Sequence, residues 1–324
     1  MKTRFMRVLL AFVLAMASSV SVAQTDFPSK PIRLLVGFPA GGSTDVVARA
    51  LAHEVRKPLG QEIVVVNRPG ASGVIAVNDL IAANPDGYTI NLSPSSAFTL
   101  GYHFMDIRPD LLEATSSILM VASQRSGLVT RSNSPQRTLK EFVAYARKNP
   151  GRVSIGIPGK GTKSELLMMA FAMKEKLDVS IVPFQGDAPI ITSLLGGHIA
   201  AASFSAGAWM SQLSSGAMRL LASNEEERFD LAPDVPTLVE MGYSLTGGSI
   251  QSLYGPKGLP ARVLERLVGA FTEATRSPGF IEIATKNGVY EKNLLAGAEL
   301  ERFLLKDRAT NTELVEMLGL KKKP

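Results

Sequence analysis

Short apolar runs alternate with longer helical segments along most of this chain of 324 residues. In the first block, we expect strands at Ile32–Phe38, Glu62–Asn67 and Tyr88–Leu92, with helices at Ser43–Lys57 and Gly73–Ala83 between them. Strands rich in Val, Ile and Leu that are separated by helices are typical of a parallel sheet with helical crossovers. The pattern therefore predicts an α/β fold.

A long apolar segment at 118–130 leads into a second alternating block. The expected helices of that block are 138–148, 162–177 and 188–195, and its expected strands are 153–157, 179–184, 199–204 and 218–222. The chain then returns through 249–254 and ends with helices at 261–275, 280–286 and 299–318. Two blocks linked by two crossing strands predict two α/β lobes with a hinge that lets them close on a ligand. The expected boundaries are 1–23 for a signal peptide, 24–123 plus 249–324 for the first lobe and 124–248 for the second.

The N-terminus has the layout of a secretory signal peptide. Three cations, Lys2, Arg4 and Arg7, precede an apolar run and then small residues that end at Ala23. The run is too short to span a membrane, so we expect export to the periplasm and cleavage after about Ala23. Without those three cations the formal charge of +6 falls to +3. Because the sequence shows no clustered basic face, no nucleic-acid partner is expected.

The chain has no cysteine. Disulfide scaffolds, thiolate metal sites and cysteine nucleophiles are therefore excluded, as is a lipid anchor on a cysteine after the signal. The core alone must hold the protein together, and a hydrophobic content of 45% in a chain of this length makes that feasible.

The first expected strand ends in a Gly-rich turn that leads into a helix. The turn comprises Phe38, Pro39, Ala40, Gly41, Gly42, Ser43 and Thr44. The first N–H groups of a helix have no intrahelical partner and attract an anion, and glycine lets the backbone approach a ligand closely. We expect these residues to contact a ligand, and an ordinary strand-to-helix turn capped by Ser43 is the alternative.

A similar turn lies in the other expected lobe. It comprises Gly159, Lys160, Gly161, Thr162, Lys163 and Ser164. Two such turns on opposite lobes favour one small anion held between them. Each helix dipole contributes roughly 0.3–1 kcal/mol, and each hydrogen bond to a charged group adds about 1.5–3 kcal/mol. The two lysines either pair with a ligand carboxylate or face solvent.

Three serines end a strand of the first lobe, where a parallel sheet presents ligand contacts. They are Ser93, Ser95 and Ser96, and their hydroxyls either contact the ligand or belong to a plain turn. Trp209, the one tryptophan, either lines the cleft or packs in the core.

No arrangement of residues predicts catalysis. Lys160-Gly161-Thr162 departs from the Walker order, and the chain lacks a Gly-x-Ser-x-Gly elbow and a His-Glu-x-x-His motif. His53, His103 and His198 lie in unrelated segments without metal-ligand spacing. We expect no catalytic residue, no metal and no cofactor. Asp45 could act as a general base, but an acid in a first helical turn more often serves a cap or the helix dipole.

A set of short motifs recurs in order along nearly the whole mature chain. They are Phe27–Ile32, Phe38–Asp45, Asn67–Gly73, Pro85–Thr89, Asn149–Gly151, Val182–Pro189, Leu195–Gly197 and Pro233–Thr237. In these motifs the chain resembles the Bug family, the periplasmic solute receptors of tripartite tricarboxylate transporters. The resemblance implies a type II periplasmic-binding-protein fold with the ligand cleft at the hinge between two lobes. It also implies that the two Gly-rich loops grip a small carboxylate, partly through ordered waters, without catalysis or a metal. Ligands typical of the family are di- and tricarboxylates, acidic amino acids and aromatic acids.

Three positions depart from the family pattern. Glu165 stands where the helix after the second loop usually carries His, and Ser203-Phe204-Ser205 replaces an aromatic–acidic pair. Gly248–Ser252 lacks a tryptophan that is common near the return crossing. We include Ser203 and Ser205 among the expected ligand contacts. The loss of an acidic residue argues against an amino-acid ligand, and an uncharged, serine-lined distal pocket favours an aromatic or hydroxylated acid.

These features predict a monomeric periplasmic receptor that closes on a small organic acid and delivers it to integral membrane transporter subunits. One alternative is a sensor that signals to a partner without transport. A second alternative is an exported enzyme in which Asp45 or Glu165 acts as general base on a carboxylated substrate.

Overall fold

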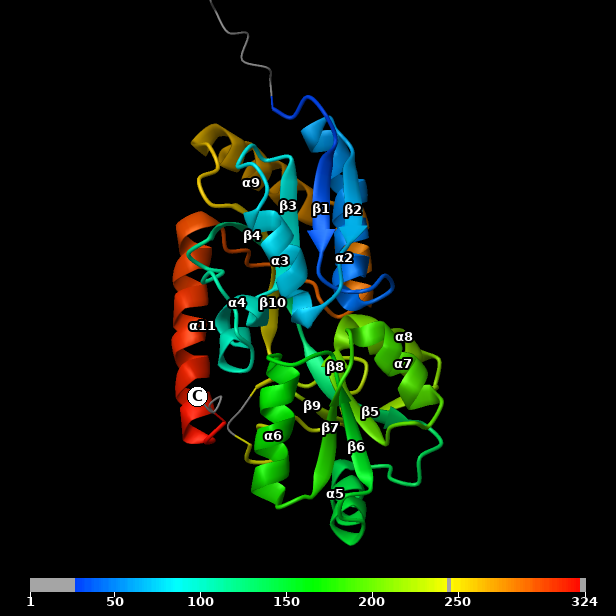
Figure 1. Ribbon diagram of the computed structural model, residues 1–324. Coiled ribbons are helices and arrows are strands. Elements are labelled where there is room, and N and C mark those ends of the chain that lie inside the picture. Colours follow the sequence, from blue (N-terminus) through cyan, green and yellow to red (C-terminus); the bar gives the residue numbers. More distant parts are fainter. Residues whose placement is uncertain (1–26, 244–245, 321–324) are drawn as a thin grey trace, which may run out of the picture.

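The computed structural model describes residues 27–243 and 246–320 and contains two five-stranded sheets, one in each of two lobes (Figure 1). Helices pack against both sheets, so the expected two-lobed α/β fold is confirmed. The expected signal peptide at 1–23 lies outside the described residues. In the part of the chain that is described, no helix is both long enough and apolar enough to cross a membrane.

Lobe 1 is built on a sheet with the strand order β2-β1-β3-β10-β4. Its strands are β1 (Ile32–Val36), β2 (Ile63–Asn67), β3 (Thr89–Pro94), β4 (Thr115–Gln124) and β10 (Ser249–Pro256). β1 runs parallel to β2 and β3, whereas β10 runs antiparallel to β3 and β4. A parallel strand with helices on both faces is apolar on both, and consecutive Leu34 and Leu35 are each at most 1% exposed.

Lobe 2 repeats this plan with the order β7-β6-β8-β5-β9. Its strands are β5 (Ser126–Arg131), β6 (Val153–Ile157), β7 (Val179–Pro183), β8 (Ala201–Ser205) and β9 (Met218–Ser223). β6 runs parallel to β7 and β8, and β5 runs antiparallel to β8 and β9. In each lobe, the antiparallel strand beside the parallel ones is the strand that arrives from the other lobe.

Helices cover both sheets (Figure 1). Lobe 1 carries α2 (Ser43–Leu59), α3 (Val74–Ile81), the short α4 (Ser96–Thr99), α9 (Ala261–Thr275), α10 (Pro278–Lys286) and α11 (Gly297–Met317). Lobe 2 carries α5 (Leu139–Lys148), α6 (Lys163–Glu175), α7 (Asp187–Leu195) and α8 (Ala206–Ser214). The sequence predicts neither α4 nor α8, because α4 is a single turn and the sequence of α8 is rich in Ala, Gly and Ser.

The chain crosses between the lobes at Arg125, which separates β4 from β5. The apolar segment expected at 118–130 is therefore two strands rather than one. The guanidinium of Arg125 lies 4.2 Å from the centre of the Phe229 ring. On the return, Ser249 at the start of β10 pairs with Gln124 at the end of β4, so the two crossings lie side by side.

α11 starts in lobe 1 and extends alongside α6 of lobe 2 (Figure 1). Leu166 of α6 packs there with Leu100 and Val315 of lobe 1 in a buried apolar cluster. Phe104 and Leu314, both partly buried, pack against this cluster. The lobes thus share an apolar contact beside the pocket in addition to their two covalent crossings.

Replacing Leu166 with alanine should lower the free energy of unfolding by about 2–4 kcal/mol, because the side chain is buried in this shared cluster. Leu305→Ala is the matched control on α11, since Leu305 is 52% exposed and its loss should change stability by about 0.5 kcal/mol or less. Urea denaturation of both variants measures the difference. Equal losses would show that the contact between α6 and lobe 1 contributes nothing.

Candidate functional site

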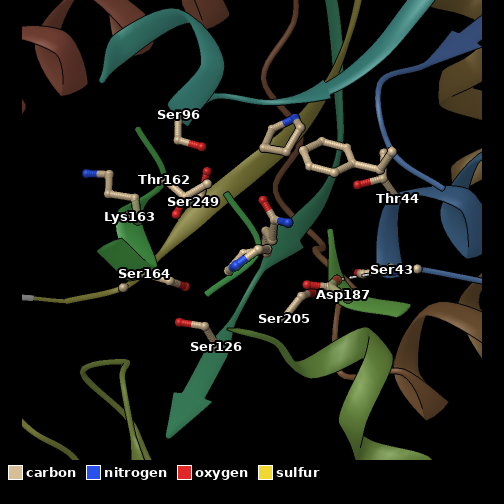
Figure 2. Close-up of a pocket in the computed structure, with 16 residues that line it drawn as sticks. Ser43, Thr44, Ser96, Ser126, Thr162, Lys163, Ser164, Asp187, Ser205 and Ser249 are labelled. Atoms are coloured by element: carbon tan, nitrogen blue, oxygen red, sulfur yellow. Dashed lines mark hydrogen bonds between the residues drawn. The ribbon is translucent and has the colours of Figure 1, made fainter. Parts of the chain in front are cut away.

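A small pocket lies between the lobes (Figure 2). Its lining consists of Phe38, Gly42, Ser43, Thr44, Pro94, Ser96, Gln124, Ser126, Pro158, Thr162, Lys163, Ser164, Asp187, Ser205, Gly247 and Ser249. Several of these residues end or follow β1, β3, β6 and β8, as expected for ligand contacts at the carboxyl ends of parallel strands. About 40 Å³ is open to the centres of water-sized molecules, which is room for roughly three waters. The pocket between the lobes is therefore small.

Both Gly-rich loops contribute to this lining. Nine of the ligand contacts predicted from the sequence line the pocket, namely Phe38, Gly42, Ser43, Thr44, Ser96, Thr162, Lys163, Ser164 and Ser205. The other predicted residues lie outside its lining, namely Pro39, Ala40, Gly41, Ser93, Ser95, Gly159, Lys160, Gly161 and Ser203. Three of these are buried serines with partners inside the protein: Ser93 donates to Asn91, Ser95 bonds Ser249, and Ser203 accepts from Asn224.

Sequence reasoning missed several lining residues. They are Pro94, Gln124, Ser126, Pro158, Asp187, Gly247 and Ser249. Gln124, Ser126 and Ser249 flank the two crossings between the lobes. They line the pocket because these crossings lie beside it. Asp187 had a recognisable signal, because it follows Gly186 at the start of a helix after a strand. The two Gly-rich loops have the same pattern of glycine before a helix start.

The first loop is fastened to its helix by Asp45. The Asp45 carboxylate accepts hydrogen bonds from the Gly41 N–H (3.0 Å), from Arg49 Nε (2.9 Å) and from Asn67 Nδ2 (2.9 Å). The residue that caps α2 is Gly42, so the predicted cap by Ser43 is wrong. Burial disfavours the charge on Asp45, but the bonds from Arg49, Gly41 and Asn67 outweigh burial and hold its pKa below the ordinary value of 3.8.

The second loop is fastened in the same way by Glu165. Its carboxylate accepts from the Gly161 N–H (2.7 Å), and its own N–H donates to Thr162 Oγ1 (3.3 Å). This is close to a capping box, in which a threonine and an acid three residues later satisfy N–H groups at the helix start. Burial raises the pKa of Glu165 above its ordinary value, against the opposing effects of the Gly161 N–H and Lys160.

Lys163 lines the pocket and also joins the lobes. Its Nζ lies 3.0 Å from Asp307 Oδ1 and 2.5 Å from Asn311 Oδ1, both on α11 of lobe 1. Thr99 donates to the other Asp307 oxygen (2.7 Å). The charge of Lys163 is thus balanced within the protein. The alternative in which this lysine faces solvent is therefore wrong.

Asp187 places a carboxylate in the pocket. It is 7% exposed, and the N–H of Ser43, across the cleft, donates to its Oδ2 (3.4 Å). Burial raises the pKa of Asp187 to about 6, although the N–H groups of Ser43 and Ser205 oppose this shift. The expectation of an uncharged distal pocket is therefore wrong.

Trp209 is fully buried and belongs to the core of lobe 2. Its Nε1 donates to the Phe204 carbonyl (2.9 Å) and its ring meets Phe229 edge-on. Packing is therefore the role that the structure gives this tryptophan. In the described ranges, no three His, Asp or Glu side chains converge in a way that would hold a metal ion.

A family model described as "Tripartite tricarboxylate transporter family receptor" matches residues 47–320. The chain belongs to this family. It is 34% identical over 310 residues to the "UPF0065 protein in gbd 5'region" of Cupriavidus necator, covering 95% of this chain and 94% of the relative. It is 32% identical over 289 residues to "Protein BugT" of Bordetella pertussis, covering 88% of this chain and 89% of BugT. Among solved structures, "periplasmic binding protein BugD" superposes with a TM-score of 0.84 at 27% identity, covering 92% of this chain and all of that one.

These findings confirm the Bug-family resemblance and make the protein a solute receptor of the tripartite tricarboxylate transporter type. The family consists of periplasmic binding proteins, so the pocket between the lobes is the candidate ligand site.

Asp45→Asn should lower the free energy of unfolding by about 1–3 kcal/mol at pH 7, because an amide cannot accept all three hydrogen bonds of the carboxylate. The folded-state pKa of Asp45 lies below 3.8, so its stabilisation is complete above that value and is lost as the pH falls through the folded pKa. Urea titrations from pH 7 to pH 3 should therefore show wild type and variant converging at the acid end. A constant gap would contradict this account.

Asp187→Asn should show the opposite trend. The folded-state pKa of Asp187 is raised to about 6 from 3.8, so the folded protein binds the extra proton between these values and wild-type stability falls as the pH rises through them. Relative to the variant, wild type should therefore lose up to about 3 kcal/mol between pH 3.5 and pH 7.5. Titration of other acids cancels in the comparison, and a pH-independent difference would refute the raised pKa.

Proposed function

We propose that this receptor captures a small organic carboxylate in the pocket between its lobes and delivers it to integral membrane subunits of a tripartite tricarboxylate-type transporter. The supporting observation is that helices from opposite lobes, α2 and α6, begin at the same small pocket. Each helix N-terminus favours negative charge, and hydroxyls of Ser43, Thr162 and Ser164 stand beside them.

The magnitudes are compatible with metabolite capture. The first N–H of α2 already donates to Asp187, so the α6 end is the helix end left for the ligand and contributes roughly 0.3–1 kcal/mol, while two or three hydrogen bonds to a charged group add about 1.5–3 kcal/mol each. Micromolar binding requires about 8 kcal/mol, so these contacts can supply it. Because Lys163 is already paired with Asp307, the ligand would be held mainly by N–H groups and hydroxyls.

The loop acids support binding without catalysis. Asp45 and Glu165 were the candidate general bases, and each is held by the glycine N–H of its own loop. Neither residue lines the pocket. A base must reach the proton that it removes, so we infer that the protein returns its ligand unchanged and needs no cofactor or metal.

We further propose that the chain is exported, is cleaved after about Ala23, and acts in the periplasm as a monomer. The supporting observations are the layout of residues 1–23 and a pocket that residues of a single chain enclose.

Gly161→Ala should weaken binding of organic acids at least about tenfold. A Cβ on Gly161 would lie 2.7 Å from the Gly101 Cα of the other lobe, so the lobes could not close fully on a ligand. Gly216→Ala is the matched control, because its φ of +73° is close to the +70° of Gly161 but no described residue lies within 4 Å of the added carbon.

The measurement is a thermal-shift screen of both variants and wild type against mono-, di- and tricarboxylates and aromatic acids, followed by calorimetry. A ligand that binds only the native state raises the melting temperature. Equal affinities for the two variants would refute closure at Gly161. Absence of any acid that stabilises wild type would refute the proposed function.

A further inference from the structure

The two sides of the pocket differ in charge. Figure 2 shows Lys163 and Ser164 on one side, at the start of α6, and Asp187 and Ser205 on the other. The first side offers a helix N-terminus and hydroxyl donors, which favour a carboxylate. The second side carries a carboxylate of the protein itself. A ligand that spans the pocket therefore meets groups that favour a negative charge at one end and a group that favours a positive charge at the other.

Among the described residues, Asp187 has no cationic partner. Its contacts are backbone N–H groups, from Ser43 across the cleft and from Ser205 beside it. Within residues 27–243 and 246–320, no Lys, Arg or His forms an ion pair with this carboxylate, and no positive side chain contributes to its pKa. A buried charge without a counter-ion is unfavourable. The site thus lacks one positive group.

Ser205 provides a second, independent observation. The side-chain oxygen of Ser205 is buried and has no hydrogen-bond partner in the part of the chain that the structure describes, although the residue is in the pocket lining. The residue is only 3% exposed. A buried hydroxyl without a partner is unfavourable, and a ligand group placed between Ser205 and Asp187 would remove that cost.

We propose that Asp187, assisted by Ser205, determines ligand specificity by binding an ammonium group, so that the receptor prefers small amino-bearing organic acids to plain ones. This inference rests on the proposed carboxylate-binding function. The ligand carboxylate lies at the α6 end and the ammonium group lies between Asp187 and Ser205. A hydroxyl can donate one neutral hydrogen bond there, and a methylene leaves both protein groups unpaired.

This assignment reverses the expectation from Ser203-Phe204-Ser205, in which the lost acidic residue argued against an amino-acid ligand. The carboxylate comes instead from the start of α7, and the N–H of Ser205 donates to it. Burial raises the pKa of Asp187 in the absence of a counter-ion, and an ammonium group beside the carboxylate would favour its charged form and lower that pKa when ligand is bound.

The test compares ligands that differ only in one substituent. The probes are succinate, malate and aspartate, then glutarate, 2-hydroxyglutarate and glutamate, and finally propionate, lactate and alanine. Calorimetry at pH 7.5 should give an affinity for the amino member at least about tenfold above that of the unsubstituted acid in one or more series. The hydroxyl member should fall between them.

Asp187→Asn keeps the shape of the side chain and an acceptor for the Ser43 N–H but removes the charge. It should reduce the amino-to-plain affinity ratio to about one, and Ser205→Ala should lower that ratio by a smaller factor. Asp230→Asn is the control, because Asp230 is an exposed acid of lobe 2 outside the pocket lining. The ratio is the decisive readout, because a purely structural role for Asp187 would weaken all three ligands of a series equally.

Plain acids that bind wild type as tightly as their amino analogues would overturn the inference and leave the proposed function standing. The inference would also fail, with the proposed function intact, if Asp187→Asn kept the wild-type ratio. Plain acids that bind more tightly as the pH is lowered would also overturn it, because a protonated Asp187 would then donate to the ligand carboxylate. If no acid of any series bound, the proposed function itself would fall.

Discussion

In both loops beside the pocket, a carboxylate from the first turn of the following helix accepts a hydrogen bond from a loop glycine. Asp45 accepts from Gly41 at 3.0 Å and Glu165 accepts from Gly161 at 2.7 Å. Both glycines have φ values that strain other residues, +83° and +70°. The acids therefore hold each turn in the one conformation that directs its helix N-terminus at the pocket. The rest of the site depends on this pairing, since both helices begin at the pocket.

The same glycine-rich segments let the lobes meet closely. A Cβ on Gly161 would lie 2.7 Å from the Gly101 Cα, and a Cβ on Gly207 would lie 2.4 Å from the Ser43 side-chain oxygen. Each contact joins the two lobes, and the Lys163–Asp307 ion pair adds a third. We propose that a ligand enters this small pocket when the lobes separate, and that the chain bends at the side-by-side crossings near Arg125 and Ser249.

Local signals were sufficient for the elements and for half of the site. The strand Val153–Ile157 and the helix Ala261–Thr275 have their predicted bounds, because alternating β-branched residues and a helix that follows proline are both local features. Phe38 and Thr162 were found because glycine followed by a helix start is visible in one stretch of sequence. Ser249 was missed as a contact, because its position depends on which strand ends meet across the cleft, whereas Asp187 had the local signal of a glycine before a helix start. The burial of Ser93 and Ser203 depends on Asn91 and Asn224, and only their tertiary neighbours decide that these serines are structural.

The position of Asp187 changes how ligand binding and closure are coupled. A carboxylate of lobe 2 accepts from the first N–H of α2 in lobe 1, so the protein's own acid already occupies the helix end expected to hold the ligand anion. A ligand carboxylate is then left with the start of α6. When the lobes separate, Asp187 regains water, and closure must remove that water again at a desolvation cost of several kcal/mol. The N–H groups of Ser43 and Ser205 offset only part of this cost, because the pKa of Asp187 still lies at about 6. A ligand that brings a positive group supplies the remainder, whereas an empty pocket cannot, and closure is therefore favoured when the correct ligand is inside.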